Sequence, residues 1–352
     1  MARPSKAGAL GRPAGRRGVL LPLVLAVTAS ASLAACGSSG SSSASSSGGT
    51  SATKITFGDL SPTTTLTPFY AAVYEGFFKK AGLNVSVEKF TGGGSSSVAA
   101  LATGAVDIAS GGPTNFISDI AKKAVTGKIF AEVAGAQYDV LATKGITSVS
   151  QLKGKTIGVS GGNSADEIYL MAVLAKYGIK PGDVTFVTSG TLAQRFGAIS
   201  SGTIKATAEL DTQRTVEQQV GTVVLKAEDS PVQVPNVTFW GSDKFRTSHA
   251  DALKRMISVL VSSATWVSQP ANKAAALADC EKGSGATAAS CEQTIAVNTN
   301  PAQAGKWTWS STWAVDTAGI AKAIDATAQV IPEAKGLTPA AVVDTSITGT
   351  QP

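Results

Sequence analysis

The chain has 352 residues, enough for two domains of ordinary size. Its formal net charge of +6 comes from the N-terminal segment, because five of the 30 basic residues and none of the 24 acidic residues precede Cys36. The remaining 25 basic and 24 acidic residues contain no Lys/Arg cluster, which excludes a nucleic-acid binder. The single histidine, His249, excludes a Cys/His zinc site, and we expect no metal and no cofactor.

The N-terminal segment predicts export and lipidation. Basic residues are followed by the apolar run Val19–Val27, and the segment ends in Leu33-Ala34-Ala35-Cys36. This pattern predicts a signal peptide over residues 1–35, cleaved at a lipobox so that Cys36 carries acyl chains on the outer face of a membrane. The run is shorter than the roughly 20 residues of a spanning helix. Arg16-Arg17 also fits a twin-arginine signal, and the alternative to lipidation is a secreted protein with an unmodified Cys36.

Residues 36–53 are predicted to be a tether. Gly37–Thr53 consists almost only of Ser, Gly, Ala and Thr, which cannot bury enough apolar surface to fold. A flexible segment of this length has a root-mean-square span of about 23 Å. The folded body would therefore stay just above the lipid surface.

From Lys54 onward, short β-branched runs alternate with helical patterns. The expected strands are Lys54–Gly58, Val85–Lys89, Val106–Ala109, Lys128–Val133, Thr156–Val159, Val184–Val187, Ala206–Leu210, Thr222–Leu225 and Val237–Trp240. The expected helices are Pro68–Ala81, Ser95–Thr103, Ser164–Tyr177, Leu192–Ser200, Thr212–Gln219 and Ser248–Ser268, with a further helix opened by Gly111–Asn115. This alternation predicts α/β layers. Ala100–Asp107 echoes Ala198–Lys205, which predicts two similar α/β lobes with a cleft between them.

The remaining cysteines form an even pair in an oxidising compartment. Cys280 and Cys291 are separated by ten residues, whereas a redox-active pair usually has two between its cysteines. We expect a structural disulfide that staples a loop between two helices.

The loop Ser61–Thr67 is a candidate for ligand contact. It holds four threonines and one serine, and it ends at a helix whose N-cap is Thr67 and whose first residue is Pro68. Free N–H groups at a helix N-terminus favour a polar or anionic ligand. The alternative is a plain cap beside a solvated loop.

Four blocks carry a family resemblance: Leu66–Leu83, Ala100–Asp107, Leu152–Val159 and Tyr177–Val184. In this order they resemble the substrate-binding proteins of ABC importers, in the branch for nitrate, sulfonates, taurine and thiamine-pyrimidine precursors. The match runs from about Lys54 to Leu210 and is weak afterwards. It implies a type II periplasmic-binding-protein clamshell, each lobe a sheet flanked by helices. Residues 54–140 and 241–346 would form lobe 1, residues 141–240 lobe 2, and the hinges would lie near Gly135–Thr143 and Val232–Ser242.

The resemblance also implies a function. The protein would be a lipid-anchored, extracytoplasmic monomer that is not an enzyme. It would capture a small polar organic solute, such as an alkanesulfonate, taurine or nitrate, and deliver it to the permease and ATPase of an importer. A thiamine-precursor pyrimidine or similar heterocycle is the alternative solute. The candidate loops contain no arginine, and the sequence leaves open where Arg195 and Arg214 point.

Further loops lie at corresponding places in the two lobes. Thr91–Ser97 and Gly111–Asn115 each open a helix with glycines that permit close backbone approach. Ser164 and Glu167 have capping-box spacing, which favours a structural role for Ser164. Asp211 stands where the family often has an acid, but Thr212 replaces the proline that follows it there. The expected solute-contacting residues are Ser61, Thr64, Thr65, Thr67, Gly94, Ser95, Gly112, Thr114, Asn115, Tyr138, Gly162, Asn163, Ser164, Gln194 and Asp211.

A competing pattern is Gly158-Val159-Ser160-Gly161-Gly162, which matches the G-x-S-x-G elbow of hydrolases, with Asp211 and His249 following in order. The expected helix begins only at Ser164, however, so no tight elbow forms at Ser160.

Three late tryptophans, Trp307, Trp309 and Trp313, are expected to pack under lobe 1; an aromatic wall beside the solute is the alternative.

Overall fold

The computed structural model describes residues 52–59, 63–90, 94–135, 138–162, 164–232, 235–300 and 309–349, without the side chains of residues 95–97 and 212. The predicted signal peptide, Cys36 and nearly all of the tether lie outside these residues. Thr50–Pro352 forms one compact unit, distinct from Met1–Gly49. Because this unit has its own apolar cores, we expect it to fold without the preceding segment.

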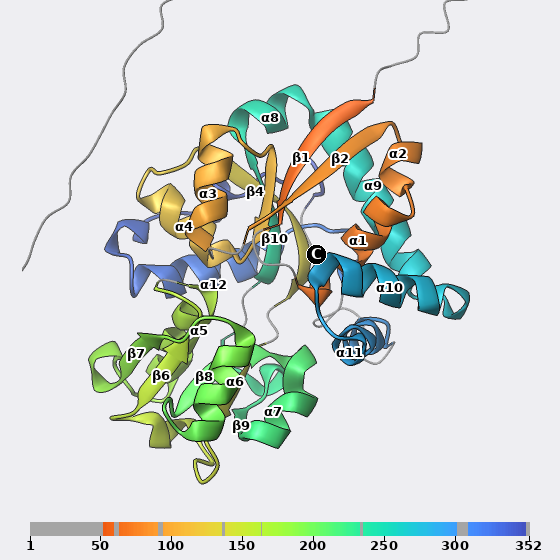
Figure 1. Cartoon of the computed structure of the whole chain (residues 1–352). Coiled ribbons are helices and arrows are strands. Elements are labelled where there is room, and N and C mark those ends of the chain that lie inside the picture. Colours follow the sequence, from red (N-terminus) through yellow and green to blue (C-terminus); the bar gives the residue numbers. More distant parts are fainter. Residues whose placement is uncertain are drawn as a thin grey trace, which may run out of the picture. The chain divides into compact units, whose positions relative to one another are not determined.

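Ten strands alternate with helices along the described chain (Figure 1). The strands are β1 Thr53–Asp59, β2 Leu83–Lys89, β3 Ile108–Gly111, β4 Gly127–Gly135, β5 Tyr138–Ala142, β6 Thr156–Val159, β7 Thr185–Thr188, β8 Ala206–Leu210, β9 Thr222–Leu225 and β10 Pro235–Ser242. The α-helices are α1 Thr67–Tyr74, α2 Phe77–Lys80, α3 Gly94–Thr103, α4 Pro113–Ala121, α5 Ala165–Lys176, α6 Leu192–Ser201, α7 Arg214–Val220, α8 Asp243–Ser248, α9 Ala250–Val267, α10 Lys273–Ser284, α11 Ala288–Asn298, α12 Thr317–Ala328 and α13 Pro339–Val342. Two short 3-10 helices used below are η1 Thr64–Leu66 and η4 Asp211–Gln213.

The strands form two mixed sheets of the same design. The first has the order β2-β1-β3-β10-β4, and the second β7-β6-β8-β5-β9. In each sheet one strand runs antiparallel to its neighbours, β10 in the first and β5 in the second. The chain passes between the sheets twice, from β4 to β5 and from β9 to β10. The predicted two-lobed α/β fold is confirmed.

Most expected strands are confirmed to within two residues. The strand β5 was not predicted, because Gly135–Thr143 read as a hinge. The expected helix Pro68–Ala81 is two helices, α1 and α2, separated at Gly76, whose φ of 70° is left-handed and ends a regular helix.

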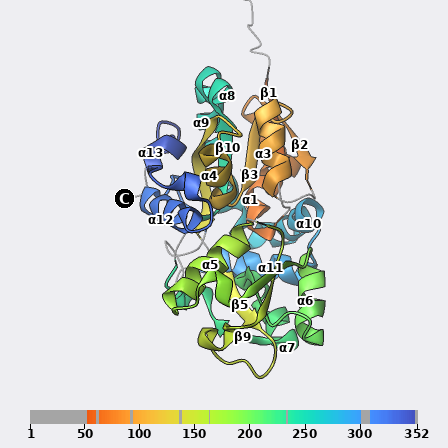
Figure 2. The same ribbon diagram turned by 90° about the vertical axis from the view of Figure 1, so that its left-hand side faces the viewer.

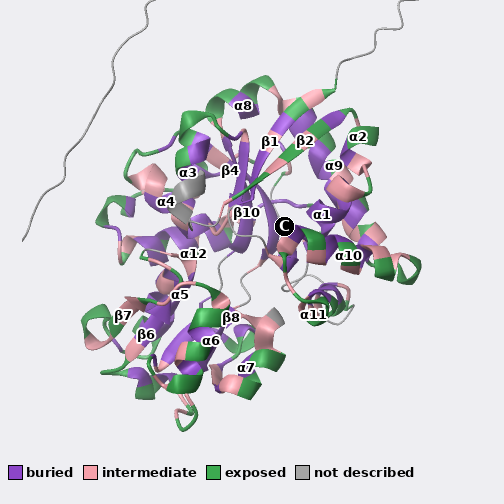
Figure 3. Ribbon diagram, viewed as in Figure 1, coloured by how far each residue is buried: buried purple, intermediate pink, exposed green. Residues whose placement is uncertain are grey.

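Most strands are buried, whereas the edge strands β2 and β7 consist mainly of exposed and intermediate residues, and the surrounding helices have one buried face (Figure 3). An aromatic cluster fills the first lobe: the Phe57 ring stacks on Phe69 with centroids 4.0 Å apart and meets Phe239 edge-on at 5.0 Å. Trp313 is fully buried against Phe239, at 5.6 Å, and Trp309 is also buried, so these two tryptophans pack in the core as expected. Trp307 lies outside the described residues.

The C-terminal helices complete the first lobe. Helices α9 and α10 contact α1, and α13 contacts β4, while α12 contacts α4 and also α5 of the second lobe (Figure 2). Cys280 of α10 and Cys291 of α11 are joined by a disulfide with a Cα–Cα distance of 5.9 Å, so the predicted staple is confirmed. Among the described residues, no helix combines the length and apolar character that crossing a membrane requires.

Replacing a glycine inside a helix by alanine usually stabilises a protein, but one helix contact predicts the opposite effect here. A Cβ at Gly283 of α10 would overlap the ring of Tyr70, which is fixed because its hydroxyl donates to Asp59 Oδ2 at 2.7 Å. Gly283→Ala should therefore destabilise the protein by about 1–3 kcal/mol through overpacking. Gly197→Ala in α6, where nothing lies within 4 Å of the added Cβ, should stabilise by up to about 1 kcal/mol. Urea unfolding measures both, and equal effects would contradict the contact.

A buried acid predicts a pH dependence of stability. Glu132 of β4 accepts the Asp316 N–H at 2.8 Å, and burial raises its pKa to about 8. Between the ordinary value of 4.5 and about 8, the folded state keeps a proton that the unfolded state has lost. Stability therefore falls as pH rises through this window. Glu132→Gln should remove that part of the loss, at most about 1.4 kcal/mol per pH unit.

Unfolding of Glu132→Gln and of the unmodified chain at a series of pH values tests this. Below about pH 4.5 Glu132 holds its proton in both states, so the two proteins should there share one pH slope, which serves as the internal control. Parallel curves across the whole range would contradict the shifted pKa.

Candidate functional site

Two helix N-termini come together where the chain passes between the sheets. Helix α4 follows β3 through the N-cap Gly112, and α5 follows β6 through the N-cap Ser164. Neither N-cap makes a side-chain hydrogen bond to its helix. Each helix therefore begins with backbone N–H groups that no N-cap side chain satisfies.

The close approach of these N-termini requires glycine at position 112. A Cβ built on Gly112 would lie 2.8 Å from the Cβ of Ala165, closer than real Cβ atoms approach. A pocket with room for about one water molecule lies at this junction. It is lined by Pro113, Thr114, Tyr138, Ala165, Ile168, Tyr169, Val232, Pro235, Asn236 and Ala326.

Three buried polar atoms gather around the junction without a partner among the described residues. They are Thr114 Oγ1, Ser164 Oγ and Asn236 Nδ2. The Thr114 and Asn236 residues are only 4% and 5% exposed. Buried polar groups in native proteins are nearly always hydrogen-bonded, and an unpaired one costs about 1–3 kcal/mol. These atoms are therefore suited to a polar partner that enters the junction.

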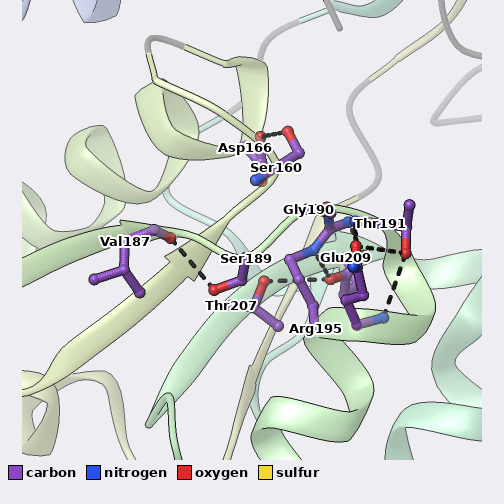
Figure 4. A network of polar contacts seen from close by, with 10 residues as sticks. Ser160, Asp166, Val187, Ser189, Gly190, Thr191, Arg195, Thr207 and Glu209 are labelled. Carbon is purple, nitrogen blue, oxygen red and sulfur yellow. Dashed lines mark hydrogen bonds and ion pairs between the residues drawn. The ribbon is translucent and has the colours of Figure 1, made fainter. Parts of the chain in front are cut away.

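The loop after β6 is held by Asp166 (Figure 4). The Ser160 N–H and the Ser160 hydroxyl each donate to this carboxylate at 2.7 Å. The expected capping box is wrong, because the Ser164 side chain makes no cap bond and its Oγ is left unpaired. Asp166, the second residue of α5, is only 5% exposed, and its carboxylate fixes the position of the loop.

The two arginines of the second lobe, Arg195 and Arg214, are both held in ion pairs. Arg195 of α6 forms a bidentate ion pair with Glu209, at 2.5 and 2.8 Å, and also donates to the Gly190 carbonyl. Burial, followed by the nearby charges of Asp166 and Glu209, raises the pKa of the Tyr138 phenol, so it stays neutral. Glu209 thus neutralises the charge of the Arg195 guanidinium. Arg214, the other arginine in question, forms ion pairs with Asp139 and Glu228.

Three threonines of the predicted ligand-contact loop are buried and hydrogen-bonded within the protein. Thr64, Thr65 and Thr67 are at most 4% exposed. The Thr67 hydroxyl donates to the Thr64 carbonyl at 2.6 Å, and Thr64 Oγ1 accepts from Thr294 of α11 at 2.7 Å. The Thr65 carbonyl accepts from the Trp309 indole at 2.8 Å. In this structure the loop anchors α11 and the C-terminal segment, and solute contact by these residues stays a prediction.

The other expected residues are spread over both lobes. Gln194 accepts from the Thr191 N–H at 2.7 Å and completes a capping box of α6, while Asp211 opens η4 directly after β8. Gly162 is exposed, Asn115 lies in the first turn of α4, and Gly94 and Ser95 begin α3. Ser61 and Asn163 lie outside the described residues. Their contact with solute stays a prediction.

Two residues at the junction were missed. Asn236 stands between Pro235 and Val237 near the start of a buried strand, and an isolated amide in an apolar strand is a signal for it. Asp166 lies in the first turn of α5 and was not among the expected site residues.

The hydrolase alternative has no support in the geometry. The Ser160 hydroxyl is hydrogen-bonded to Asp166, whereas the His249 ring stacks on Phe245 and its Nδ1 pairs with the Ser248 hydroxyl at 2.8 Å. His249 therefore pairs with Ser248, and Ser160 pairs with Asp166. Within the described part of the chain, no group of three or more His, Cys, Asp or Glu side chains is placed to hold a metal ion.

Comparison with known proteins shows the family to which this chain belongs. Residues 63–274, more than half of the chain, match the model of the family described as NMT1/THI5 like. The protein YtlA of Bacillus subtilis (strain 168) is 23% identical over 234 residues, which are 61% of this chain and 66%, just under two thirds, of that protein.

Two solved structures are similar in fold. The periplasmic aliphatic sulphonate binding protein SsuA of Escherichia coli has a TM-score of 0.64 at 16% identity, over 85% of this chain and 94% of that one. The periplasmic nitrate-binding protein NrtA of Synechocystis PCC 6803 has a TM-score of 0.59 at 16% identity, over 79% of this chain and 80% of that one.

The Asp166 contacts predict an ordered pair of stability effects. Asp166→Asn keeps the shape but leaves the Ser160 N–H or hydroxyl without its acceptor, and should cost about 1–3 kcal/mol. Ser160→Ala removes only the hydroxyl bond and should cost about 0.5–1.5 kcal/mol. Urea unfolding at one pH measures both changes. A larger loss in Ser160→Ala than in Asp166→Asn would contradict the loop-holding role of Asp166.

Proposed function

Because the chain belongs to the NMT1/THI5 like family, we propose that it is an extracytoplasmic solute-binding protein of an ABC importer. The fold is that of the sulphonate-binding and nitrate-binding proteins compared above. The protein captures a small polar solute between its two lobes and performs no chemistry on it. The solute reaches the permease when the protein docks there.

One observation carries this proposal. Thr114 Oγ1, Ser164 Oγ and Asn236 Nδ2 are buried and unpartnered within the described chain, at a junction built from both lobes. Leaving such groups unpaired lowers stability, so their retention is explained by a ligand that pairs with them. The pocket itself holds about one water molecule, so solute entry requires the helix N-termini to move apart. The two chain crossings, near Gly135–Thr143 and Val232–Ser242, are the proposed hinges.

The proposed solute carries one compact oxyanion group, as an alkanesulfonate, taurine or nitrate does. Two helix N-termini and neutral donors favour a single negative charge. Arg195 supplies little attraction because Glu209 pairs with it. A pyrimidine-like ring is the second candidate, because the Tyr138 ring could stack on it and the carboxyls of Asp166 and Glu209 lie close enough to influence that phenol.

We also propose that Cys36 is lipidated and that the 36–53 tether keeps the folded unit beside its permease. The support is the lipobox sequence Leu33-Ala34-Ala35-Cys36 and the Ser/Gly composition that follows it.

The proposal predicts that two hydroxyls serve binding and not stability. Thr114→Ala and Ser164→Ala each remove a buried oxygen that has no partner among the described residues, so each should leave unfolding stability unchanged or slightly raised. A solute that raises the melting temperature of the unmodified chain should do so less in both variants, with Kd raised about tenfold for each lost hydrogen bond.

A melting screen over alkanesulfonates, taurine, nitrate and pyrimidines finds the solute, and titration calorimetry measures the variants. Thr265→Ala is the control, since this exposed hydroxyl only bonds the Val261 carbonyl of its own helix, at 3.2 Å. If Thr265→Ala weakens binding as much as Thr114→Ala does, the junction is not the site. If no solute in the screen raises the melting temperature, the importer function is rejected.

A further inference from the structure

A groove with basic walls lies between α2 and α9, on the outside of the first lobe. It is lined by Phe77, Ala81, Lys254, Arg255, Ser258, Val259 and Ser262, and we call it the α2–α9 groove. It is wide and open, with a volume of about 410 Å³. Its lining combines an apolar floor with hydroxyls and two exposed cations.

Positive charges outnumber negative charges on the two helices around the groove. Helix α2 carries Lys79 and Lys80, and α9 carries Lys254 and Arg255, all four exposed. Asp251 is the acid of α9, and α2 has none. None of these four cations belongs to an ion pair with a carboxylate among the described residues. The groove therefore presents a net positive charge over an apolar floor.

The chain enters the folded unit beside this groove. The Thr53 N–H donates to the Gly82 carbonyl at 3.0 Å, just beyond the end of α2, and Arg255 Nη2 donates to Thr53 Oγ1 at 3.4 Å. Lys54 adds a further exposed cation next to this point. Only 16 residues separate Cys36 from Thr53, so a lipid on Cys36 would keep the groove within reach of the bilayer.

We propose that the α2–α9 groove binds the headgroups of an anionic phospholipid bilayer. Lys254 and Arg255 pair with headgroup phosphates, and the Ser258 hydroxyl donates a hydrogen bond to the same oxygens. Lys79, Lys80 and Lys54 add attraction to the negatively charged surface. A basic patch beside an acyl anchor adds an electrostatic attachment to the same membrane surface. This contact is separate from solute binding and does not require Cys36.

The test uses residues 50–352, which form one compact unit and lack both Cys36 and the basic N-terminal segment. The protein is sedimented with phosphatidylcholine vesicles and with vesicles that also contain phosphatidylglycerol. We expect binding to the anionic vesicles alone, weakened by salt. Lys254→Glu with Arg255→Glu should lower the partition coefficient by about 30-fold or more. Melting curves confirm that the variant is folded.

The matched control is Lys322→Glu with Lys335→Glu, which changes the net charge equally at exposed positions outside the groove. It should retain most of the binding, and an equal loss in this control would overturn the proposal by assigning the effect to net charge. Absence of binding by the unmodified unit would overturn it as well. Glycerol 3-phosphate should displace the protein no better than sodium chloride at equal ionic strength. Specific displacement would assign the groove to a soluble phosphate and reject the membrane surface.

Discussion

The contact between Gly112 and Ala165 is the constraint on which the proposed site depends. It brings together the N-termini of α4, which follows a strand of the first sheet, and α5, which follows a strand of the second. It leaves no room for a side chain at position 112. The helices reach this point because β3 and β6 end beside the two chain crossings. The antiparallel strands β5 and β10 each follow a crossing, and each fixes that crossing by pairing inside its own sheet. Topology, and not local sequence, therefore brings the N-termini together.

Hydrogen bonding divides the polar residues into those that build the protein and those available to a solute. Asp166, Arg195 and Glu209 are saturated by one another or by the backbone of their own lobe. The pairing of Arg195 with Glu209 leaves this guanidinium unavailable to a solute. At the junction, the atoms without partners among the described residues are instead on the small neutral side chains of Thr114, Ser164 and Asn236. Such a site selects by geometry and hydrogen bonding more than by charge.

The sequence predicts the fold better than the site because the two depend on contacts of different range. Alternating β-branched runs and helix caps are local, so most of the strands and helices could be predicted. The threonine loop could not be interpreted, since the partners that turn Thr64 and Thr65 inward are Thr294 and Trp309, more than 220 residues away. The capping box failed because Asp166, one residue before the expected Glu167, fits the Ser160 N–H as well as its hydroxyl.

The α2–α9 groove also depends on contacts between residues that are far apart in the sequence. Lys79 and Lys80 are separated from Lys254 and Arg255 by more than 170 residues, so the nearly neutral folded part of the chain contains no basic run. Packing of α2 against α9 creates the local charge. The groove lies beside the start of β1, whereas β1 and β3 both end at the edge of the sheet from which α4 begins. A strand of seven residues spans roughly 20 Å. Membrane contact at one end of β1 therefore leaves the junction at the other end accessible, and the two activities can occur in one molecule at the same time.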